Sequence, residues 1–165
     1  MEKIISEKIQ KIIANKKKLE ENLGVKITSR GREISIDGPA KEEYYAEKVI
    51  DALNFGFSFD TAILIKKEDF VFEILNIKDH TQRKDLERIR ARIIGKGGKT
   101  LKVLHDLTEC SFELNENKVG IIGHPESIKN AEESVISIIK GAKHSNVYSH
   151  LEKNKVKPVI DLGLK

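Results

Sequence analysis

The sequence predicts an α+β protein built from two tandem modules, each with a three-stranded sheet packed on one side by about three helices. Two observations lead to this fold class. Apolar residues and glycines recur at an offset of 85 residues, and each copy shows the same order of strand and helix patterns. A length of 165 residues leaves room for two small domains, each with its own core.

The repeat aligns apolar positions and glycines together. The aligned pairs are Val25 with Cys110, Ile27 with Phe112, Ile34 with Val119, Ile36 with Ile121, Gly38 with Gly123, Ala46 with Ala131, Ile50 with Val135, Leu53 with Ile138 and Gly56 with Gly141. Agreement in both the apolar phase and the glycine positions indicates two copies of one supersecondary unit.

Each copy contains two short strands and a helix. Alternating apolar residues predict the strands, a Gly-Pro or Gly-His-Pro turn follows them, and apolar positions three and four apart predict the helix. The predicted strands are Val25 to Thr28, Ile34 to Asp37, Cys110 to Leu114 and Lys118 to Ile122, and the predicted helices are Lys41 to Leu53 and Pro125 to Ile139.

The two copies differ upstream of these strands. Leu19 still matches Leu104 at the offset of 85, whereas Ile12 matches Ile93 only at an offset of 81. The first copy is therefore four residues shorter, and the missing residues correspond to the segment Gly95-Lys96-Gly97-Gly98, called the glycine loop below. In the first copy we expect an unbroken helix, roughly from Glu7 to Asn22.

The glycine loop has the composition of a phosphate cradle. It interrupts a helix predicted from about Lys84 to Ile94, and another helix begins near Lys99. Glycines let a phosphate approach the backbone closely, and the helix that follows offers free N–H groups. The loop is not a nucleotide-hydrolysing P-loop, because that motif needs a glycine five residues before Gly98, where Ile93 stands.

The excess positive charge gathers around this loop. Residues 1–70 carry 13 basic and 13 acidic side chains, so the whole net charge of +4 comes from residues 71–165. Between positions 83 and 102, eight basic side chains face only Asp85 and Glu87. Such a block suits a polyanion, since phosphate binding releases counterions. A solvated helix face is the alternative on charge alone.

Residues 71–150 resemble a type I KH domain. Val71 to Ile77 matches its first strand, and the run Ile94-Gly95-Lys96-Gly97-Gly98-Lys99-Thr100 matches its signature. The preceding degenerate copy and the run from Gly141 to Tyr148 resemble the archaeal two-KH ribosomal RNA-processing family, which is related to the eukaryotic factor called partner of Nob. We therefore expect a degenerate KH-like module over 1–70, a KH module over 71–153 and a tail over 154–165. The family's first module often keeps a GXXG-like loop, and this chain lacks it.

The resemblance implies that the second module holds about four nucleotides of single-stranded RNA, with the glycine loop on their backbone. Arg90 and Arg92 are two residues apart on one helix, so at most one is expected to point into the groove. Ser111 and Glu113 are placed to read base edges. The implied RNA-binding residues are Ile94, Gly95, Lys96, Gly97, Gly98, Lys99, Arg90, Arg92 and Leu101. For Ile94 and Leu101, packing in the core is the alternative to a floor beneath the bases.

The implied function is small-subunit ribosome biogenesis, with binding near the 3′ end of 16S rRNA. The implied partners are the PIN-domain endonuclease that matures that end and the α subunit of translation initiation factor two. Two alternatives remain: a general KH regulator of mRNA or single-stranded DNA, and a protein-interaction scaffold with a relic RNA site. No enzyme, cofactor or metal is expected, since the sequence shows neither a catalytic set nor metal-ligand spacing.

The remaining features have structural explanations. The run from Phe55 to Phe59 is expected to form a buried junction between the modules, with base stacking as the alternative. His144 and His150 are expected on the surface, and Cys110 in the core. No apolar run approaches the length of a membrane span, so we expect a cytoplasmic protein.

Overall fold

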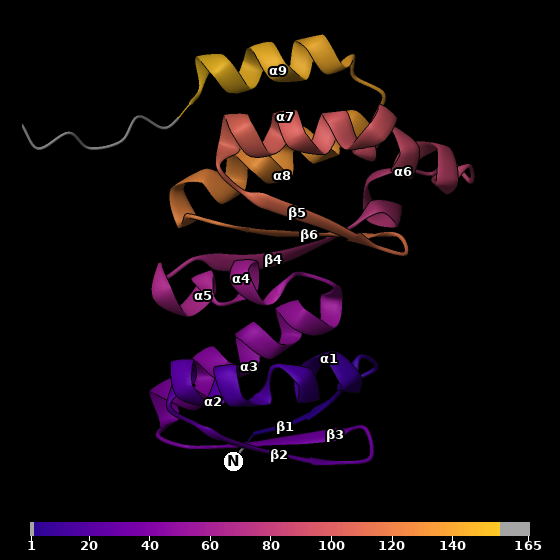
Figure 1. Cartoon of the computed structure of the whole chain (residues 1–165). Coiled ribbons are helices and arrows are strands. Elements are labelled where there is room, and N and C mark those ends of the chain that lie inside the picture. Colours follow the sequence, from indigo (N-terminus) through magenta and orange to yellow (C-terminus); the bar gives the residue numbers. More distant parts are fainter. Residues whose placement is uncertain (1, 156–165) are drawn as a thin grey trace, which may run out of the picture.

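The computed structural model describes residues 2–155, which form two three-stranded antiparallel sheets, one in each half of the chain (Figure 1). The strand orders are β1-β3-β2 and β4-β6-β5, so the last strand of each sheet lies in its centre. The predicted α+β fold class is confirmed. The strands are β1 (Glu2–Ile5), β2 (Lys26–Arg30), β3 (Glu33–Asp37), β4 (Val71–Asn76), β5 (Ser111–Asn115) and β6 (Lys118–Gly123).

The strand register reproduces the sequence repeat. Ile27 lies opposite Ile36 in the first sheet, and Phe112 lies opposite Ile121 in the second. Phe112 and Ile121 follow Ile27 and Ile36, respectively, by 85 residues. The two hairpins are therefore equivalent in register as well as in sequence.

Helices cover one face of each sheet with apolar side chains. In the first half, α3 packs on β3 and β1 and is covered in turn by α1, α2, α4 and α5. In the second half, α8 packs on β6 and β4, and α6, α7 and α9 surround it. The helices are α1 (Ile9–Ala14), α2 (Lys16–Leu23), α3 (Ala40–Phe55), α4 (Phe59–Ala62), α5 (Leu64–Lys67), α6 (Leu86–Ile94), α7 (Lys99–Thr108), α8 (Pro125–Ile139) and α9 (His144–Lys153), with short 3₁₀ turns η1 (Ile77–His80) and η2 (Lys96–Gly98).

The expected unbroken helix from Glu7 to Asn22 is wrong, because the chain breaks at Asn15 into α1 and α2. The backbone of Asn15 leaves the helical region, with φ −104° and ψ 5°. Its side-chain amide donates a hydrogen bond to the Lys11 carbonyl at 2.8 Å. Asparagine competes in this way for the backbone groups of a helix end. The first module thus keeps a break between its first two helices without the glycine loop.

The two halves stack, so that the outer face of the second sheet rests on the helices of the first half (Figure 1). Phe55 and Phe57 stack with ring centroids 6.0 Å apart, and Phe72 of β4 meets both edge-on at 5.9 and 5.7 Å. Ile122 of β6 belongs to the same core. The Asn115 amide donates to the Phe55 carbonyl at 3.1 Å.

This arrangement confirms the buried junction predicted for the run from Phe55 to Phe59. Phe55 and Phe57 are only 7% and 3% exposed, so their rings are not available for stacking on bases. A continuous apolar core across the junction favours a fixed relation between the two halves.

Candidate nucleic-acid interface

The glycine loop forms a tight turn between α6 and α7. Its three glycines all have positive φ angles: 78° at Gly95, 61° at Gly97 and 78° at Gly98. Gly95 combines this angle with ψ 168°, and a Cβ there would lie 2.2 Å from the Thr100 hydroxyl. Only glycine fits such a close approach. Around Gly97 and Gly98, by contrast, a Cβ would meet nothing within 4 Å, so the backbone is open there.

The start of α7 has no side-chain cap. Gly98 is the N-cap residue, and no side chain bonds to the first turn. The Gly98 N–H donates to the Gly95 carbonyl at 3.1 Å and the Lys99 N–H to the Lys96 carbonyl, so the loop is a hydrogen-bonded turn. The positive end of the helix dipole favours a phosphate at this point. Lys96 and Lys99 are both exposed and add positive charge beside the backbone groups.

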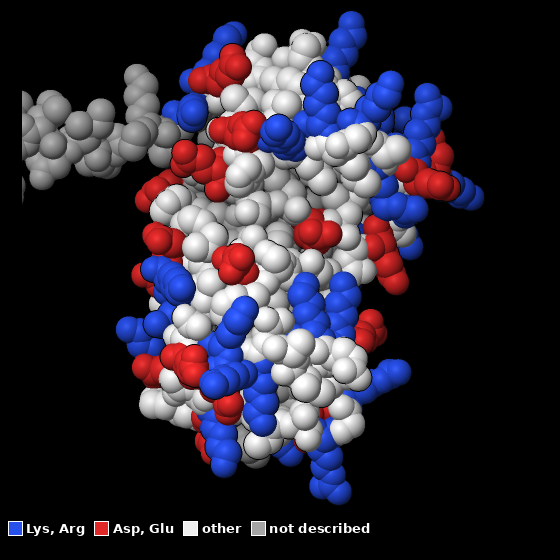
Figure 2. Space-filling view, viewed as in Figure 1, with Lys and Arg blue, Asp and Glu red and all other residues white. Residues whose placement is uncertain are grey.

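Lysine and arginine side chains gather over α6 and the beginning of α7, as Figure 2 shows. The predicted basic block therefore lies on one part of the folded surface. Its basic residues are Arg83, Lys84, Arg88, Arg90, Arg92, Lys96, Lys99 and Lys102. Of these, Arg83 is paired with Asp85, its Nη2 lying 2.9 Å from the carboxylate.

Apolar side chains adjoin the loop on both sides. Ile94, the residue before Gly95, is 37% exposed, which is unusual for an isoleucine in this fold. Leu101 is half-buried and packs against the core of the second module. Ile94 thus offers an exposed apolar surface beside the glycine loop, while Leu101 anchors the first turn of α7 to the core.

The two arginines expected near the groove have different surroundings. Arg90 bonds to the side chain of Asn117 in the turn between β5 and β6. Arg92 donates to the carbonyls of Ile138 and Ala142, both at 2.6 Å. Arg92 therefore ties α6 to the end of α8 and to the turn that follows it.

His144 departs from the expected surface position. It is half-buried, and its Nε2 lies 2.9 Å from the Arg92 carbonyl, so it belongs to the same link. No local sequence signal indicates this link, because its partners are 46 to 52 residues apart in the chain. His150 is exposed on α9, as predicted.

Glu113 belongs to the junction between the modules. Burial is the main cause that raises the pKa of its carboxyl, while Lys8 and Lys11 of the first module act in the opposite direction. Lys11 also donates a hydrogen bond to the Phe57 carbonyl. Of the two strand residues expected to read base edges, Glu113 thus has contacts that join the modules. Ser111 is half-buried at the start of β5.

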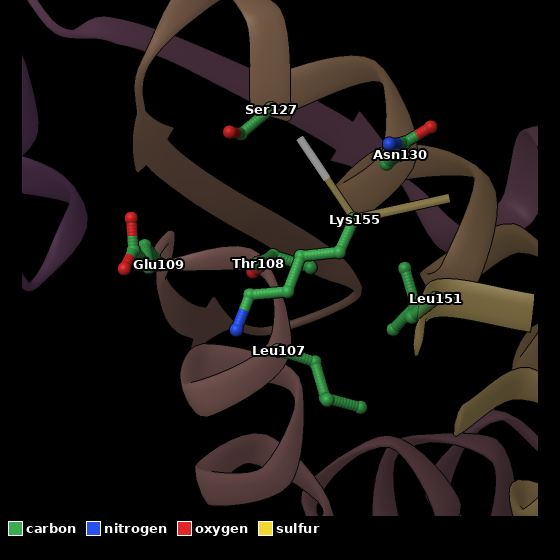
Figure 3. A pocket seen from close by; sticks show the side chains of 7 residues that line it. All are labelled: Leu107, Thr108, Glu109, Ser127, Asn130, Leu151 and Lys155. Atoms are coloured by element: carbon green, nitrogen blue, oxygen red, sulfur yellow. The ribbon is translucent and has the colours of Figure 1, made fainter. Parts of the chain in front are cut away.

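A small pocket lies at the far end of α7 from the glycine loop (Figure 3). It is lined by Leu107 and Glu109 at the end of α7, by Asn130 of α8, and by Leu151 and Lys155 at the C-terminal end of the described chain. Its volume of about 20 Å³ suffices for about one water molecule. This pocket is too small for a cofactor and takes no part in the interface.

Within residues 2–155 no three His, Cys, Asp or Glu side chains come together as a metal site, and no helix has the length and apolar character of a membrane span. Cys110 is buried as predicted, and burial raises the pKa of its thiol to about 11. A neutral thiol of this kind is a poor nucleophile.

The second half of the chain matches a known domain family. A family model for the second KH domain of PNO1, described as a eukaryotic type KH domain of type I, matches residues 71–156. A KH domain-containing protein of Methanocaldococcus jannaschii is 29% identical over 149 residues, covering 86% of this chain and 66% of that protein. The pre-rRNA-processing protein PNO1 of Kluyveromyces lactis is 36% identical over 105 residues, covering 62% of this chain and 38% of PNO1. The chain thus spans less than two thirds of the length of these curated relatives.

Solved structures extend the likeness through both halves. Dim2p of Pyrococcus horikoshii OT3 superposes with a TM-score of 0.84 and 27% identity, covering 92% of this chain and 98% of that chain. A chain from a complex of a/eIF2alpha, aDim2p and rRNA from the same organism gives 0.84 and 28%, with 93% of both chains covered. The names of these relatives describe RNA-associated proteins rather than enzymes. Because the family model covers more than half of the sequence and the fold matches Dim2p throughout, the chain belongs to the PNO1/Dim2 family of type I KH proteins.

Proposed function

We propose that this chain binds single-stranded RNA through the glycine loop of its second module and acts in maturation of the small ribosomal subunit, near the 3′ end of 16S rRNA. The observation that carries the proposal is the open space around Gly97 and Gly98, which lead into a helix N-terminus without a side-chain cap within a basic surface. Backbone donors of this kind bind phosphates without reading sequence, as KH loops do.

In this proposal each predicted residue has a physical role. Gly95, Gly97 and Gly98 shape the cradle, and Lys96 and Lys99 neutralise the phosphates that enter it. Ile94 contacts the bases, with Leu101 as the support beneath it. Arg90 holds the turn between β5 and β6 beside the groove. Arg92 acts as a positioning residue, since its guanidinium is engaged with the carbonyls of Ile138 and Ala142.

The relatives supply the biological setting of the proposal. Pre-rRNA processing is the role printed in the name of PNO1, and a matched structure contains rRNA and a/eIF2alpha. We therefore propose small-subunit rRNA and the α subunit of initiation factor two as partners, in the cytoplasm. The association with a PIN-domain endonuclease stays a prediction from the family resemblance.

The division of labour between the modules is also part of the proposal. We assign RNA binding to a KH module over 71–153 and a supporting role to a degenerate module over 1–70. The break at Asn15 has no glycine with an open backbone, which supports this assignment. Most of the expected tail over 154–165 lies outside the described residues.

Gly97→Asp tests the RNA site with a matched control. Gly97 and Gly31 have nearly the same φ, 61° and 62°, and a Cβ at either one would meet nothing within 4 Å. Aspartate tolerates this region of φ, so both variants should fold. Gly31 lies in the hairpin turn of the first module, far from the glycine loop in sequence.

Binding of labelled oligonucleotides is measured for wild type, Gly97→Asp and Gly31→Asp, with the rRNA 3′-end sequence and a scrambled sequence at two salt concentrations. We expect Gly97→Asp to weaken binding by at least about tenfold, because a carboxylate repels phosphate in the cradle, and Gly31→Asp to bind as wild type. Equal loss in both variants would contradict the assigned site. Equal binding of the two sequences would point to a general KH regulator, and no binding at all to a protein scaffold.

A further inference from the structure

A groove runs between helix α3 of the first module and strand β4 of the second. Two hollows form it, with volumes of about 700 and 400 Å³. Both are lined by Lys48, Phe72 and Glu73, so they meet at the middle of β4. Neither hollow includes a residue of the glycine loop.

One wall of this groove is a strand with a free edge. β4 pairs only with β6, which places it at the margin of its sheet. Within residues 2–155, no backbone hydrogen bond joins Val71–Asn76 to an element on its other side. Strand edges normally carry protection such as proline or a bulge, and the sequence Val-Phe-Glu-Ile-Leu-Asn has neither proline nor a break in its register with β6.

Large apolar side chains are exposed at both ends of the groove. Tyr44 of α3 is 57% exposed and Ile74 of β4 is 52% exposed, whereas most large hydrophobic residues of the described chain are buried. Phe72 lies between them and lines both hollows. Aromatic and aliphatic anchors beside a strand edge are the features of a surface that takes up an extended peptide.

The charge of the groove is opposite to that of the glycine loop. Two lysines line the hollows, and Lys48 sits over the Tyr44 ring at 5.7 Å. Five carboxylates line the same hollows: Glu7, Asp51, Asp69, Glu73 and Glu116. An RNA backbone would be repelled here, and a cationic segment would be attracted.

Asp51 and Glu73 also interact with acidic side chains beside the groove. Burial, followed by the negative charge of Glu47, raises the pKa of Asp51, while Lys48 acts in the opposite direction. Burial and then Glu73 raise the pKa of Glu132 on α8, so the negative field continues past β4 onto that helix. Bound cationic groups would relieve this repulsion.

From the free edge, the two hollows and the negative charge, we propose that β4 binds an extended, lysine- or arginine-rich segment of a protein partner as an added strand. The segment's backbone pairs with the edge of β4, its apolar side chains enter the hollows beside Phe72 and Ile74, and its cationic side chains meet Asp51, Glu73 and Glu116. This surface is independent of the glycine loop, so the chain can hold RNA and a protein segment together.

The probe for this surface is a labelled eight-residue peptide of alternating lysine and valine with blocked ends. Its controls are the glutamate–valine counterpart and a lysine–valine peptide with alternate backbone amides methylated. Ile74→Lys places a positive charge at the anchor. Its matched control is Ile13→Lys on α1, where the isoleucine is 47% exposed outside the groove.

We expect the lysine–valine peptide to bind and to shift the NMR amide signals of Val71–Asn76. Binding should weaken by at least about tenfold in Ile74→Lys, and by less than about twofold in Ile13→Lys. The methylated and the glutamate–valine peptides should not bind, because the first lacks backbone donors and the second has the wrong charge.

Three outcomes would overturn the proposal. The first is equal peptide affinity in the two isoleucine variants. The second is undiminished binding of the methylated peptide, since strand addition needs those donors. The third is self-association of the wild-type chain that Ile74→Lys abolishes, which would make this edge a contact between copies. Oligonucleotide binding, measured on the same variants, separates failure of this surface from failure of the RNA site.

Discussion

The two modules share a strand register but differ at the junction of their first two helices. In the second module the glycine loop separates α6 from α7, and in the first module only Asn15 separates α1 from α2. The Asn15 side chain donates a hydrogen bond to the Lys11 carbonyl, whereas the space around Gly97 and Gly98 is open. The helical break therefore occurs in both modules, and the four additional residues form the proposed phosphate site only in the second.

The outer face of the second sheet is apolar, whereas the outer face of the first sheet is polar. In the second sheet, Gly120 and Ile122 face the phenylalanines of the junction, and Ile122 is 1% exposed. The equivalent positions of the first sheet, 85 residues earlier, hold Ser35 and the exposed Asp37. An apolar face accepts the neighbouring module, and a polar face ends the stack. Sequence differences at a few outward positions thus determine which sheet packs its outer face against the other module.

The largest effect on stability should come from adding a side chain at Gly120, where the junction leaves no room for one. A Cβ there would lie 2.6 Å from the Phe55 ring, so Gly120→Val should lower the free energy of unfolding by about 3 kcal/mol through overpacking. Ser35→Val, at the equivalent position of the first sheet, should change it by less than about 0.5 kcal/mol. Urea denaturation of both variants measures the difference. Similar values for the two would mean that the two outer faces are energetically equivalent.

The next largest effect on stability should differ between Gly95 and Gly97 of the glycine loop. Gly95→Ala should cost about 2 kcal/mol of stability, because the added methyl meets Thr100 and the backbone lies in a region open only to glycine. Gly97→Ala should cost about 1 kcal/mol, the ordinary penalty of a left-handed residue with free space around it. Thermal or urea unfolding gives both values. A larger loss at Gly97 would contradict the assignment of Gly95 as the structural glycine.

The sequence predicted the repeated hairpins well because strand alternation and paired glycines are local signals. It missed the break at Asn15, since the apolar spacing of α1 and α2 continues through it and a single asparagine is a weak signal. It located the glycine loop, but not the engagement of Arg92 with Ile138 and Ala142, which depends on where α8 ends in space. The sequence also could not predict the place of Glu113 in the junction, because the neighbouring Lys8 and Lys11 come from the other module.

A smaller effect is expected on the salt dependence of RNA affinity when lysines near the starts of α7 and α2 are replaced. Lys96→Ala and Lys99→Ala should each reduce the slope of log affinity against log salt by about 0.7, the value for one phosphate contact on a single strand. Lys16→Ala and Lys17→Ala, exposed at the start of α2, should change the slope by less than half as much, because no glycine cradle accompanies them. Titration of the rRNA oligonucleotide over a salt series gives the slopes. Equal changes in both pairs would show that the first module also contacts the phosphates.

A pH-dependent effect concerns the core position where the first module has Val25 and the second has Cys110. Burial raises the pKa of the Cys110 thiol from 9.0 to about 11. The folded state thus favours the neutral thiol. This contribution to stability is complete below the pKa of the thiol in the unfolded chain and is lost as the pH rises through its pKa in the folded chain.

Cys110→Val, which copies the first module, should remove that contribution. Urea unfolding at about pH 8 and about pH 10.5 should therefore show a larger alkaline loss in wild type than in the variant, because the lysines and tyrosines common to both cancel in the comparison. An identical loss in the two proteins would mean that Cys110 ionises as freely in the folded chain as in the unfolded one.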